Sequence, residues 1–486
     1  MEFSVSNNAT HRRHQEVVHW IFMRALGAIA LVAFVSYWIQ LAGLIGSHGV
    51  APAEPYLRSV AESLGPFDRL INLPTLAWLS ASDTALAILC GTGVLASVLL
   101  IANIAPRVMC FFLWALYLSL SNADQVFLSF QWDTLLIETC FLAIFTTPGR
   151  GFLMRWLLFR LMFSSGLCKI TSQDETWRNL TALYYHYETQ PLPTWIGWFA
   201  HQLPHWCQKF SVASMFVVEL LMPMLIFFPQ RRIRHATFGA LAGLQLLIFL
   251  TGNYCFFNLL TIVLCLFVLD DHDLMLLLPA KAIKWLQKRR SNAKENRLFA
   301  RGAALVTAVF LVFGSLNVAS VIARRGGLPL VAFDMLSAIA PLRTVNSYGL
   351  FASMTTERDE ITIEGSNDGR LWLPYGFKWK PGPLNERPKF VAPYQPRLDW
   401  QMWFAALGNF RSSPWLQNLF VRLLQGEPAV LGLLKTNPFP DKPPRFIRAQ
   451  IARYQFTDYD ERRRTGNWWI REEPQPYAQP LSLRDL

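Results

Sequence analysis

Polar side chains stand inside the apolar segments of this chain, where a bilayer would make them costly. Gln131, Thr134 and Glu138 share one face of a segment at helical spacing, and Asp133 lies near the outer end of the same segment. Arg160 lies in the middle of the next apolar segment. Ionisable groups inside a membrane span usually face the bundle interior and mark functional sites. This face therefore predicts either a polar cavity that handles protons or ion pairs between helices.

Two further charged residues extend this set. Lys169 lies near the outer end of the segment that holds Arg160, and Glu219 lies four residues before Pro223, where a kink could free backbone carbonyls. The structural interpretation pairs Glu138 and Glu219 with Arg160 or Lys169 and holds helices in register. In the functional interpretation these groups line a polar cavity that handles protons and opens toward the outside. The predicted intramembrane network comprises Gln131, Asp133, Glu138, Arg160, Glu219, Asn253 and Asn258.

A loop over residues 171–209 is unusually rich in aromatic, imidazole and carboxylate groups. It is either an amphipathic segment at the membrane interface or a lid and docking surface for a partner. His201 and His205 could ligate a metal from one helical face, but no third ligand stands at motif spacing. We expect no metal and no cofactor. The predicted partner surface comprises Trp177, Arg178, Asn179, His186, Tyr187, Glu188 and Gln190.

The composition shows what kind of protein must position these groups. The 486 residues are 52% hydrophobic and only 16% charged, whereas soluble domains carry about 25% charged residues. The net charge of +12 would suggest a nucleic-acid partner in a soluble protein, but here the basic residues bracket apolar segments. The sequence therefore predicts a membrane protein in contact with lipid and without a nucleic-acid partner. Its seven cysteines fit no zinc spacing, and we expect buried thiols.

Nine apolar runs predict an α-helical multi-pass bundle of about nine spans. Basic residues at 11–14 place the amino terminus inside, and the positive-inside rule then places everything after Ala323 outside, with Arg324 and Arg325 as the one violation. The first run is too long for a cleaved signal core and predicts a signal anchor. The runs are Ile21–Ile45, Thr84–Ala105, Val108–Leu120, Val126–Thr147, Phe152–Ile170, Phe210–Phe228, Ala236–Leu250, Tyr254–Leu269 and Gly302–Ala323.

The chain divides into a cytoplasmic segment 1–20, a membrane domain 21–325 and an extracytoplasmic domain 333–486. In the last domain, residues 360–365 alternate apolar and polar side chains before the turn sequence Ser366-Asn-Asp-Gly. Residues 372–380 can return as the partner strand, and 445–456 and 468–472 are further strands. Helical spacing marks 399–407 and 415–434. We expect an α+β domain, with a β-sandwich-like sheet and inserted helices.

Long motifs in both parts of the chain resemble the lipase maturation factor family. In the membrane part they read Phe130-Gln-Trp-Asp-Thr-Leu-Leu-Ile-Glu-Thr, Tyr185-His-Tyr-Glu-Thr-Gln-Pro-Leu-Pro and Thr251-Gly-Asn-Tyr-Cys-Phe-Phe-Asn. The resemblance runs from about residue 15 to residue 470 and implies a membrane protein that assists secreted lipases. It implies the endoplasmic reticulum, or the inner membrane for a bacterial member. The outer-domain motif residues are Glu364, Asn367, Asp368, Arg397, Asp399 and Trp400.

A more distant resemblance is to the HTTM membrane domain shared with vitamin K-dependent γ-carboxylase. Ser165-Gly-Leu-Cys-Lys-Ile followed by Trp177 is similar to the setting of that enzyme's catalytic lysine. The resemblance implies that Lys169 could act as a base, helped by Glu138 or His186. The sequence departs from the pattern at Cys168, where the enzyme has a lysine, so the activity does not carry over with the fold alone.

Three functions therefore stand as hypotheses. The favoured one is a chaperone-like, non-catalytic factor that binds a secreted lipase or another exported hydrolase. The alternative is an intramembrane enzyme of γ-carboxylase type that uses Lys169 as a base. A transporter of lipid or a small solute is a third, lower-ranked possibility, which flux in proteoliposomes would test.

Overall fold

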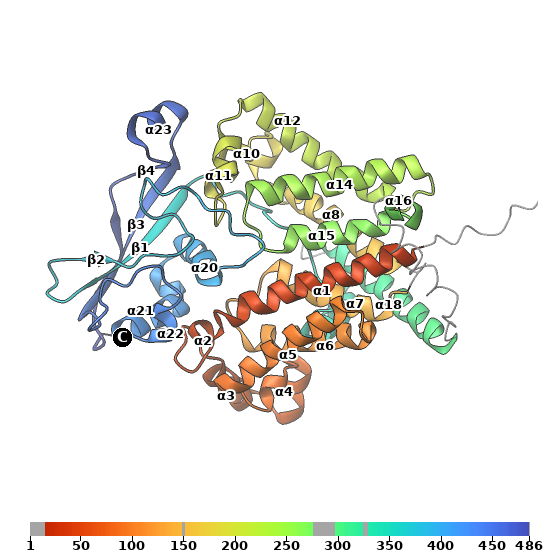
Figure 1. The fold of residues 1–486 in the computed structure, drawn as a ribbon, viewed down its shortest axis with the longest axis horizontal. Helices are drawn as coiled ribbons and strands as arrows, with labels where there is room; N and C mark the ends of the chain where they lie inside the picture. Colours follow the sequence, from red (N-terminus) through yellow and green to blue (C-terminus); the bar gives the residue numbers. More distant parts are fainter. Residues whose placement is uncertain (1–14, 148–150, 276–296, 324–328, 486) are drawn as a thin grey trace, which may run out of the picture.

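The computed structural model describes residues 15–147, 151–275, 297–323 and 329–485. A helical bundle is followed by an α+β domain that covers one end of it, as Figure 1 shows. The basic residues that were predicted at 11–14, Arg150, most of the loop 270–301, Arg324 and Arg325 lie outside the described residues.

Each of the nine predicted apolar runs contains a helix. Within the described residues, five helical segments are long and apolar enough to cross a membrane: Glu16–Trp38, Asp83–Ile101, His205–Leu225, Arg231–Thr251 and Arg301–Ile322. The helices in these runs are α1 (Glu16–Trp38), α5 (Asp83–Ile101), α6 (Pro106–Ala123), α7 (Gln131–Phe145), α8 (Phe152–Thr171), α12 (His205–Phe216) with α13 (Met222–Leu225), α14 (Arg231–Thr251), α15 (Phe257–Cys265) and α18 (Arg297–Ile322).

Short helices join the long ones. The loop between α1 and α5 contains α2 (Leu41–Leu44), α3 (Ala53–Ser63), α4 (Pro66–Asn72) and the 3-10 turn Leu76–Trp78. The loop between α8 and α12 contains α9 (Glu175–Arg178), α10 (Leu183–Thr189) and α11 (Trp195–His201). The remaining ones are a π-helical stretch Val217–Leu221, a 3-10 turn Leu266–Val268, α16 (Asp271–Met275), α19 (Leu330–Ile339) and a 3-10 turn Ala340–Leu342.

Small residues let the first two long helices approach closely. A Cβ added to Gly93 of α5 would lie 2.2 Å from the ring of Phe34 on α1, and one added to Gly27 of α1 would lie 2.9 Å from Ile101. Close backbone approach at small residues is a usual way to pack helices in a bilayer, where apolar burial gives little driving force. The α1–α5 pair is thus packed through glycine.

Successive long helices run in opposite directions, so alternate ends meet the C-terminal domain. The carboxyl end of α1 bonds the domain through Gln40, whose Nε2 donates to the Gln395 carbonyl at 2.8 Å. The amino end of α7 bonds it through Asp133, and the carboxyl end of α14 is followed by Asn253, which bonds residues 389–392. At the far end, Asp271 accepts from the first backbone amides of α1. The bundle thus has one end toward the domain and one end away from it.

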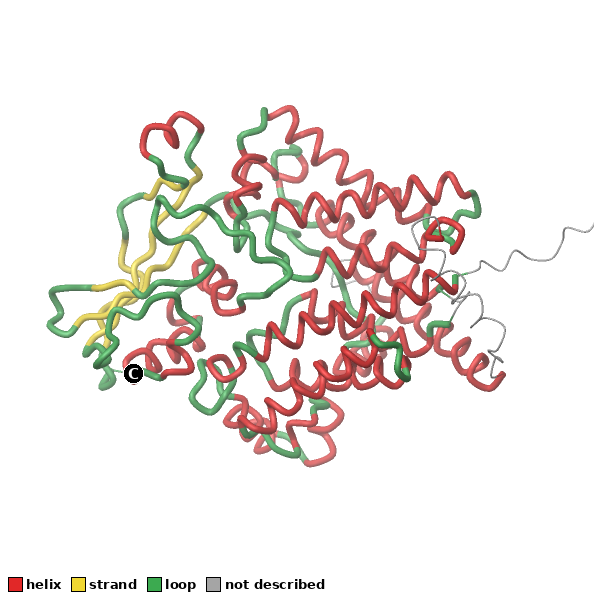
Figure 2. Tube along the Cα trace, in the orientation of Figure 1, coloured by secondary structure: helices red, strands yellow, loops and turns green. Residues whose placement is uncertain are grey.

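The C-terminal domain combines one antiparallel sheet with helices, as the yellow strands in Figure 2 show. Strand β3 (Phe446–Phe456) pairs with β1 (Arg358–Ser366), β4 (Trp469–Arg471) and β5 (Gln475–Leu481), and β2 (Leu373–Pro374) pairs with β1. The helical elements are α20 (Arg397–Ala406), the 3-10 turn Phe410–Ser412, α21 (Pro414–Gln425), α22 (Pro428–Leu431) and α23 (Tyr459–Thr465).

The predicted α+β class is confirmed, but the sandwich-like arrangement is wrong. The described strands form one five-stranded sheet, and helices take the place of a second sheet. Ile361 and Ile363 on β1 and Ile447 on β3 are fully buried, and they belong to the same core as Leu398 of α20 and Leu419 of α21. Amphipathic helices can cover the apolar face of a sheet as well as a second sheet does.

Candidate functional site

The polar face of α7 holds the segment that connects the bundle to the C-terminal domain. Glu138 is fully buried, pairs with Arg160 of α8, and accepts from the Tyr348 hydroxyl at 2.7 Å. The same carboxylate accepts from the backbone and side-chain nitrogens of Asn346 at 3.0 and 2.9 Å. About two turns nearer the domain, the Gln131 Oε1 accepts from the Gly349 amide at 3.0 Å. The predicted face is therefore occupied by residues 346–349.

A second buried ion pair joins α7 directly to the C-terminal domain. The Nη2 and Nη1 atoms of Arg397 donate to the Asp133 carboxylate at 2.8 and 3.0 Å, and neither side chain is exposed. The Tyr117 hydroxyl donates to the same carboxylate at 2.6 Å. Two parallel hydrogen bonds give an arginine–carboxylate pair a defined geometry as well as charge compensation. Arg397 thus fixes the start of α20 on the end of the bundle.

Lys169 forms a third buried pair. Its Nζ donates to the Glu219 Oε2 at 2.7 Å and Oε1 at 3.0 Å, and to the Ser165 carbonyl at 3.2 Å. The Trp177 ring lies 5.5 Å from the ammonium. Glu219 lies in the π-helical stretch of the α12–α13 segment, and such stretches are frequent at functional sites. The structural interpretation pairs Glu138 and Glu219 with Arg160 or Lys169 without choosing between them. In the structure Glu138 pairs with Arg160, and Glu219 pairs with Lys169.

The aromatic loop lies beneath the sheet rather than free at the surface. Arg358 of β1 donates to the carbonyls of Glu188 and Pro191 at 2.8 and 3.0 Å, and the Glu188 carboxylate accepts from the Phe456 amide at 2.9 Å. Gln190 is buried and accepts from the Tyr254 hydroxyl at 2.9 Å. This loop is thus a structural layer between bundle and domain.

Burial changes the acid–base behaviour of the loop. His186 bonds the Tyr254 hydroxyl at 3.1 Å through Nε2, and burial, with the nearby Lys169, lowers its pKa to about 4. Burial likewise lowers the pKa of His201 to about 4 and raises that of Glu188. Both imidazoles are therefore neutral at pH 7.

The predicted partner surface is divided by the fold. Trp177 is buried and donates from Nε1 to the Phe351 carbonyl at 3.0 Å. Tyr187 is partly buried against an apolar cluster that includes Trp198 and Trp469. Arg178 and Asn179 are exposed at the end of α9. Of the seven residues, these two are exposed, and the other five are buried or partly buried.

Asn253 and Asn258 serve different contacts. The Asn253 Oδ1 accepts from the Val391 and Ala392 amides at 2.8 and 3.1 Å, and its Nδ2 donates to the Lys389 carbonyl at 2.8 Å. The Asn258 amide bonds Gln245 at 2.8 Å inside the bundle. Asn253 therefore joins the bundle to the C-terminal domain, whereas Asn258 joins two helices inside the bundle.

The motif residues of the C-terminal domain organise that domain. The buried Asp399 accepts from the Trp379 and Lys380 amides at 2.7 and 3.0 Å, and burial raises its pKa. Trp400 packs edge-on against Trp132 of α7 with ring centroids 4.9 Å apart. These two residues set the position of α20. Of the rest, Glu364 pairs with Arg448 across the sheet at 2.7 Å, Asp368 caps the hairpin turn, and Asn367 is exposed there.

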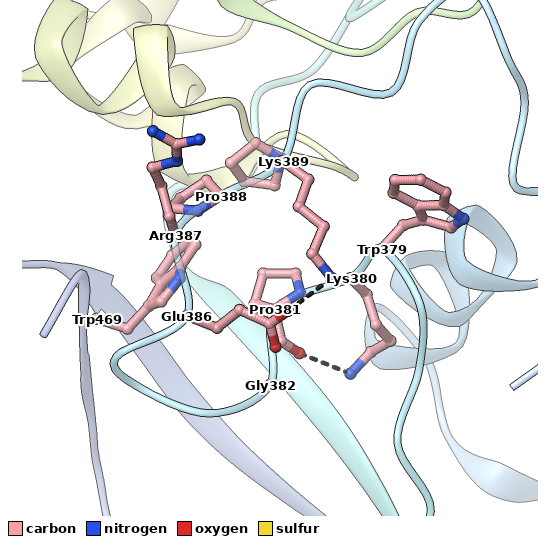
Figure 3. A pocket seen from close by; sticks show the side chains of 10 residues that line it. Trp379, Lys380, Pro381, Gly382, Glu386, Arg387, Pro388, Lys389 and Trp469 are labelled. Atoms are coloured by element: carbon pink, nitrogen blue, oxygen red, sulfur yellow. Dashed lines mark hydrogen bonds and ion pairs between the residues drawn. The ribbon is translucent and has the colours of Figure 1, made fainter. Parts of the chain in front are cut away.

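A shallow pocket lies where the loop after β2 meets the aromatic loop, as Figure 3 shows for Lys380, Lys389, Trp379 and Trp469. Its lysines could have served as nucleophiles, but each has a carboxylate partner. Lys380 pairs with Glu360 at 2.8 Å, and Lys389 with Glu386 at 2.6 Å. The pocket is thus lined by ion pairs.

The described residues contain no group of three metal-ligating side chains. His201 lies 3.9 Å from Glu188, whereas the ring of His205 stacks on Tyr184 with centroids 4.2 Å apart. The two histidines therefore have different neighbours. All seven cysteines are free thiols within the described residues, and five are buried, as expected for small apolar side chains.

Sequence reasoning missed several partners of the predicted residues. Tyr348 and Asn346 carry no signal, since they lie in an irregular segment after the last long apolar helix. The Arg358–Glu360 pair could have been predicted, because residues two apart on a strand share a face. These two side chains pair at 2.5 Å. Tyr117 was hidden in an apolar run, where a single hydroxyl changes the hydropathy little.

Two family models match the chain, one in each part. The family model described as the lipase maturation factor transmembrane domain matches residues 17–276, and the one described as the lipase maturation factor C-terminal domain matches residues 344–479. No solved structure matches the chain.

Curated relatives match almost the whole chain. Lipase maturation factor 2 of Gallus gallus is 36% identical over 96% of this chain and 81% of the relative, and that of Homo sapiens is 35% identical over 96% and 82%. Lipase maturation factor 1 of Bos taurus is 37% identical over 96% of this chain and 89% of the relative. The chain therefore belongs to the lipase maturation factor family.

Proposed function

We propose that this protein is a membrane-embedded factor that assists the folding or assembly of secreted lipases without catalysing a covalent step. The relatives' names supply the client class. One observation supports a non-catalytic role: the charged groups at this end of the bundle are already held in ion pairs. Asp133, Glu138 and Lys169 each have an oppositely charged partner. These pairs join elements, which is what a scaffold for a client requires.

We further propose nine spans, with the amino terminus inside and the C-terminal domain outside the cytosol. The alternating helix directions support an odd number of crossings between the amino terminus and the domain. The far end of the bundle carries Arg107, Arg231, Arg232 and Arg234, as expected for a cytoplasmic face. The membrane is that of the endoplasmic reticulum, or the inner membrane in a bacterium. The domain division into 1–20, 21–325 and 333–486 stays a prediction that this placement would explain.

The client surface proposed here centres on Arg178 and Asn179. These two exposed residues belong to the aromatic loop and lie on the domain side of the bundle. The test is capture of a co-expressed secreted lipase by the full-length protein in mild detergent. We expect capture by the wild type and a several-fold loss in an Arg178→Glu/Asn179→Ala variant. Arg232→Ala, exposed at the opposite end, is the matched control and should leave capture unchanged.

If the wild type captures no secreted lipase or other exported hydrolase, the proposed role is wrong. Equal capture by the Arg178→Glu/Asn179→Ala variant would remove only the proposed surface.

The alternative, an enzyme that uses Lys169 as a base, is favoured by its position beside His186 and by the π-helical stretch at Glu219. Lys169→Arg separates the two functions, because arginine keeps the ion pair but stays protonated in proteins. The scaffold proposal expects near-normal lipase maturation by this variant. The enzyme alternative expects loss of activity, measured as active lipase secreted per unit of stably folded protein.

A further inference from the structure

A groove between α11 and α23 of the C-terminal domain brings aromatic rings and arginines together. It has a volume of about 320 Å³ and is lined by Trp198 and Phe199 of α11 and by Tyr459, Arg462, Arg463 and Gly466 in and after α23. We call it the aromatic–arginine groove. It lies apart from the buried ion pairs of Asp133, Glu138 and Lys169, and the proposed role in lipase maturation does not use it.

The donors of this groove lack strong acceptors. The Arg462 guanidinium lies 3.4 Å from the centre of the Trp468 ring and 5.5 Å from that of Trp198, and it has no ion-pair partner among the described residues. Arg463 has an 82% exposed side chain, and its contact with Asp460 is 3.9 Å long. The fully buried Trp198 has an indole nitrogen without an acceptor within the described ranges. The two arginines thus present positive charge beside the aromatic rings of the groove.

The groove adjoins the beginning of a candidate membrane span. Helix α12 starts at His205, four residues after α11 ends, and belongs to the segment His205–Leu225 that is long and apolar enough to cross a bilayer. Trp206 is 71% exposed and Phe210 is 68% exposed on this first part. Exposed tryptophan at the end of a span marks the membrane–water interface. The groove therefore lies beside the headgroup layer.

Contacts tie α23 to this interface. The Gln202 side chain, in the turn between α11 and α12, donates to the Thr457 carbonyl at 3.1 Å, two residues before α23 begins. The Tyr459 ring packs edge-on against Trp198 with centroids 5.1 Å apart. Figure 1 shows α23 and the beginning of α12 on the same side of the molecule. Arginines held at this level meet lipid phosphates first.

We propose that the aromatic–arginine groove binds the headgroup of an anionic phospholipid in the leaflet that faces the C-terminal domain. Arg462 and Arg463 bond the phosphate, and Phe199 and Tyr459 contact the glycerol and the upper acyl chains. Arginine suits this role because its planar donors match phosphate oxygens. The proposal rests on the membrane placement of α12 and not on the lipase role, so lipid binding can fail while lipase capture succeeds.

The test titrates the full-length protein in uncharged detergent with dihexanoyl phosphatidylglycerol, and follows bound lipid by native mass spectrometry. We expect saturable binding that weakens about tenfold or more in Arg462→Ala/Arg463→Ala, since each lost guanidinium removes charge-assisted hydrogen bonds. Arg463→Glu alone, at an exposed position, should weaken binding comparably without a change in thermal stability. Arg464→Ala is the matched control, because Arg464 belongs to the same helix, pairs with Glu461 and does not line the groove.

Three outcomes would overturn the proposal. Equal binding by the wild type, Arg463→Glu and the double variant would place the lipid elsewhere. Equally tight binding of glycerol 3-phosphate, which has no acyl chains, would identify a site for free phosphate compounds. Tighter binding of an acidic peptide of alternating Glu and Leu would identify a protein-docking groove.

Discussion

The Asp133–Arg397 pair shows how one buried ion pair can join two domains. A charge buried without a partner is costly, whereas a bidentate pair with an added tyrosine hydroxyl compensates most of that cost. The two residues come from α7 and α20, and neither is exposed. Either side chain therefore depends on the other domain being in place, which couples the folding of bundle and domain.

Removing one member of this pair should be strongly destabilising. We expect Arg397→Met to lower the free energy of unfolding by about 3–5 kcal/mol, because it leaves Asp133 buried and unpaired. Thermal unfolding of the full chain in detergent measures the effect. Asp133→Leu/Arg397→Met should recover most of the loss, since apolar side chains replace both charges.

The surface pair Glu364–Arg448 serves as the control for this experiment. Both side chains are partly exposed, so Arg448→Ala should cost only about 0–1 kcal/mol. An Arg397→Met protein as stable as the wild type would show that the buried pair does not join the domains.

At the scale of the element, the aromatic loop should make stability depend on pH. Burial lowers the pKa of His186 and of His201 to about 4, below the value of about 6.5 in the unfolded chain. The unfolded state therefore binds more protons below pH 6.5, and stability falls as the pH drops from 6.5 toward 4. The free energy of unfolding of the wild type should fall between pH 7 and pH 5. We expect this fall to be about 2 kcal/mol smaller in His186→Gln.

Thermal melts at both pH values measure this difference. An identical pH dependence for wild type and His186→Gln would mean that this imidazole is not buried in the neutral form.

Helix α2 makes a second element-scale prediction. A Cβ at Gly43 would lie 2.5 Å from the Ala429 carbonyl of α22, a backbone atom that has little freedom to move. Gly43→Ala should therefore loosen this contact and destabilise the protein by about 1–3 kcal/mol. Gly239→Ala in α14, which meets nothing within 4 Å, should be neutral or slightly stabilising. Equal melting temperatures for the two variants would contradict the close packing of α2 on α22.

Most elements could be predicted from the sequence, because periodicity records which face of a helix or strand is buried. Observed elements correspond to the nine apolar runs, to the strand predicted at 360–365 with its following turn, and to the strand predicted at 445–456. The edge strand β5, which contains Pro476 and Pro480, was missed because proline weakens a strand pattern. The apolar helix α19 was not predicted, and it crosses the predicted start of the last domain at residue 333.

The candidate site was harder to predict than the fold. Charges in apolar runs are visible in a sequence, so Glu138, Lys169 and Glu219 were found. Their partners were visible only where they too were charged. Tyr348 and the backbone amides of residues 346–349 come from a segment far along the chain, and pairing across such separations follows from three-dimensional packing alone.

At the scale of the whole molecule, one end of the bundle meets the C-terminal domain, and the other end carries Arg107 and Arg231–Arg234. This arrangement predicts opposite accessibility at the two ends. An epitope inserted at the exposed turn Asn367–Gly369 should be labelled from the side that faces away from the cytosol in sealed membranes. An epitope between Gln230 and Arg231 should be labelled only after permeabilisation. If both epitopes were labelled from the same side, the chain could not cross the membrane an odd number of times between these two positions, and the proposed topology would be wrong.

The central claim is that the charged groups at this junction act as structure rather than as chemistry. Lys169→Met/Glu219→Met tests it most directly, because it removes both charges of the pair while keeping similar side-chain volume. The measurement is the amount of active lipase secreted by cells that depend on this protein, normalised to folded protein. We predict that the double variant supports secretion close to the wild-type level. A folded double variant that yields no active lipase would contradict the account and favour catalysis by Lys169.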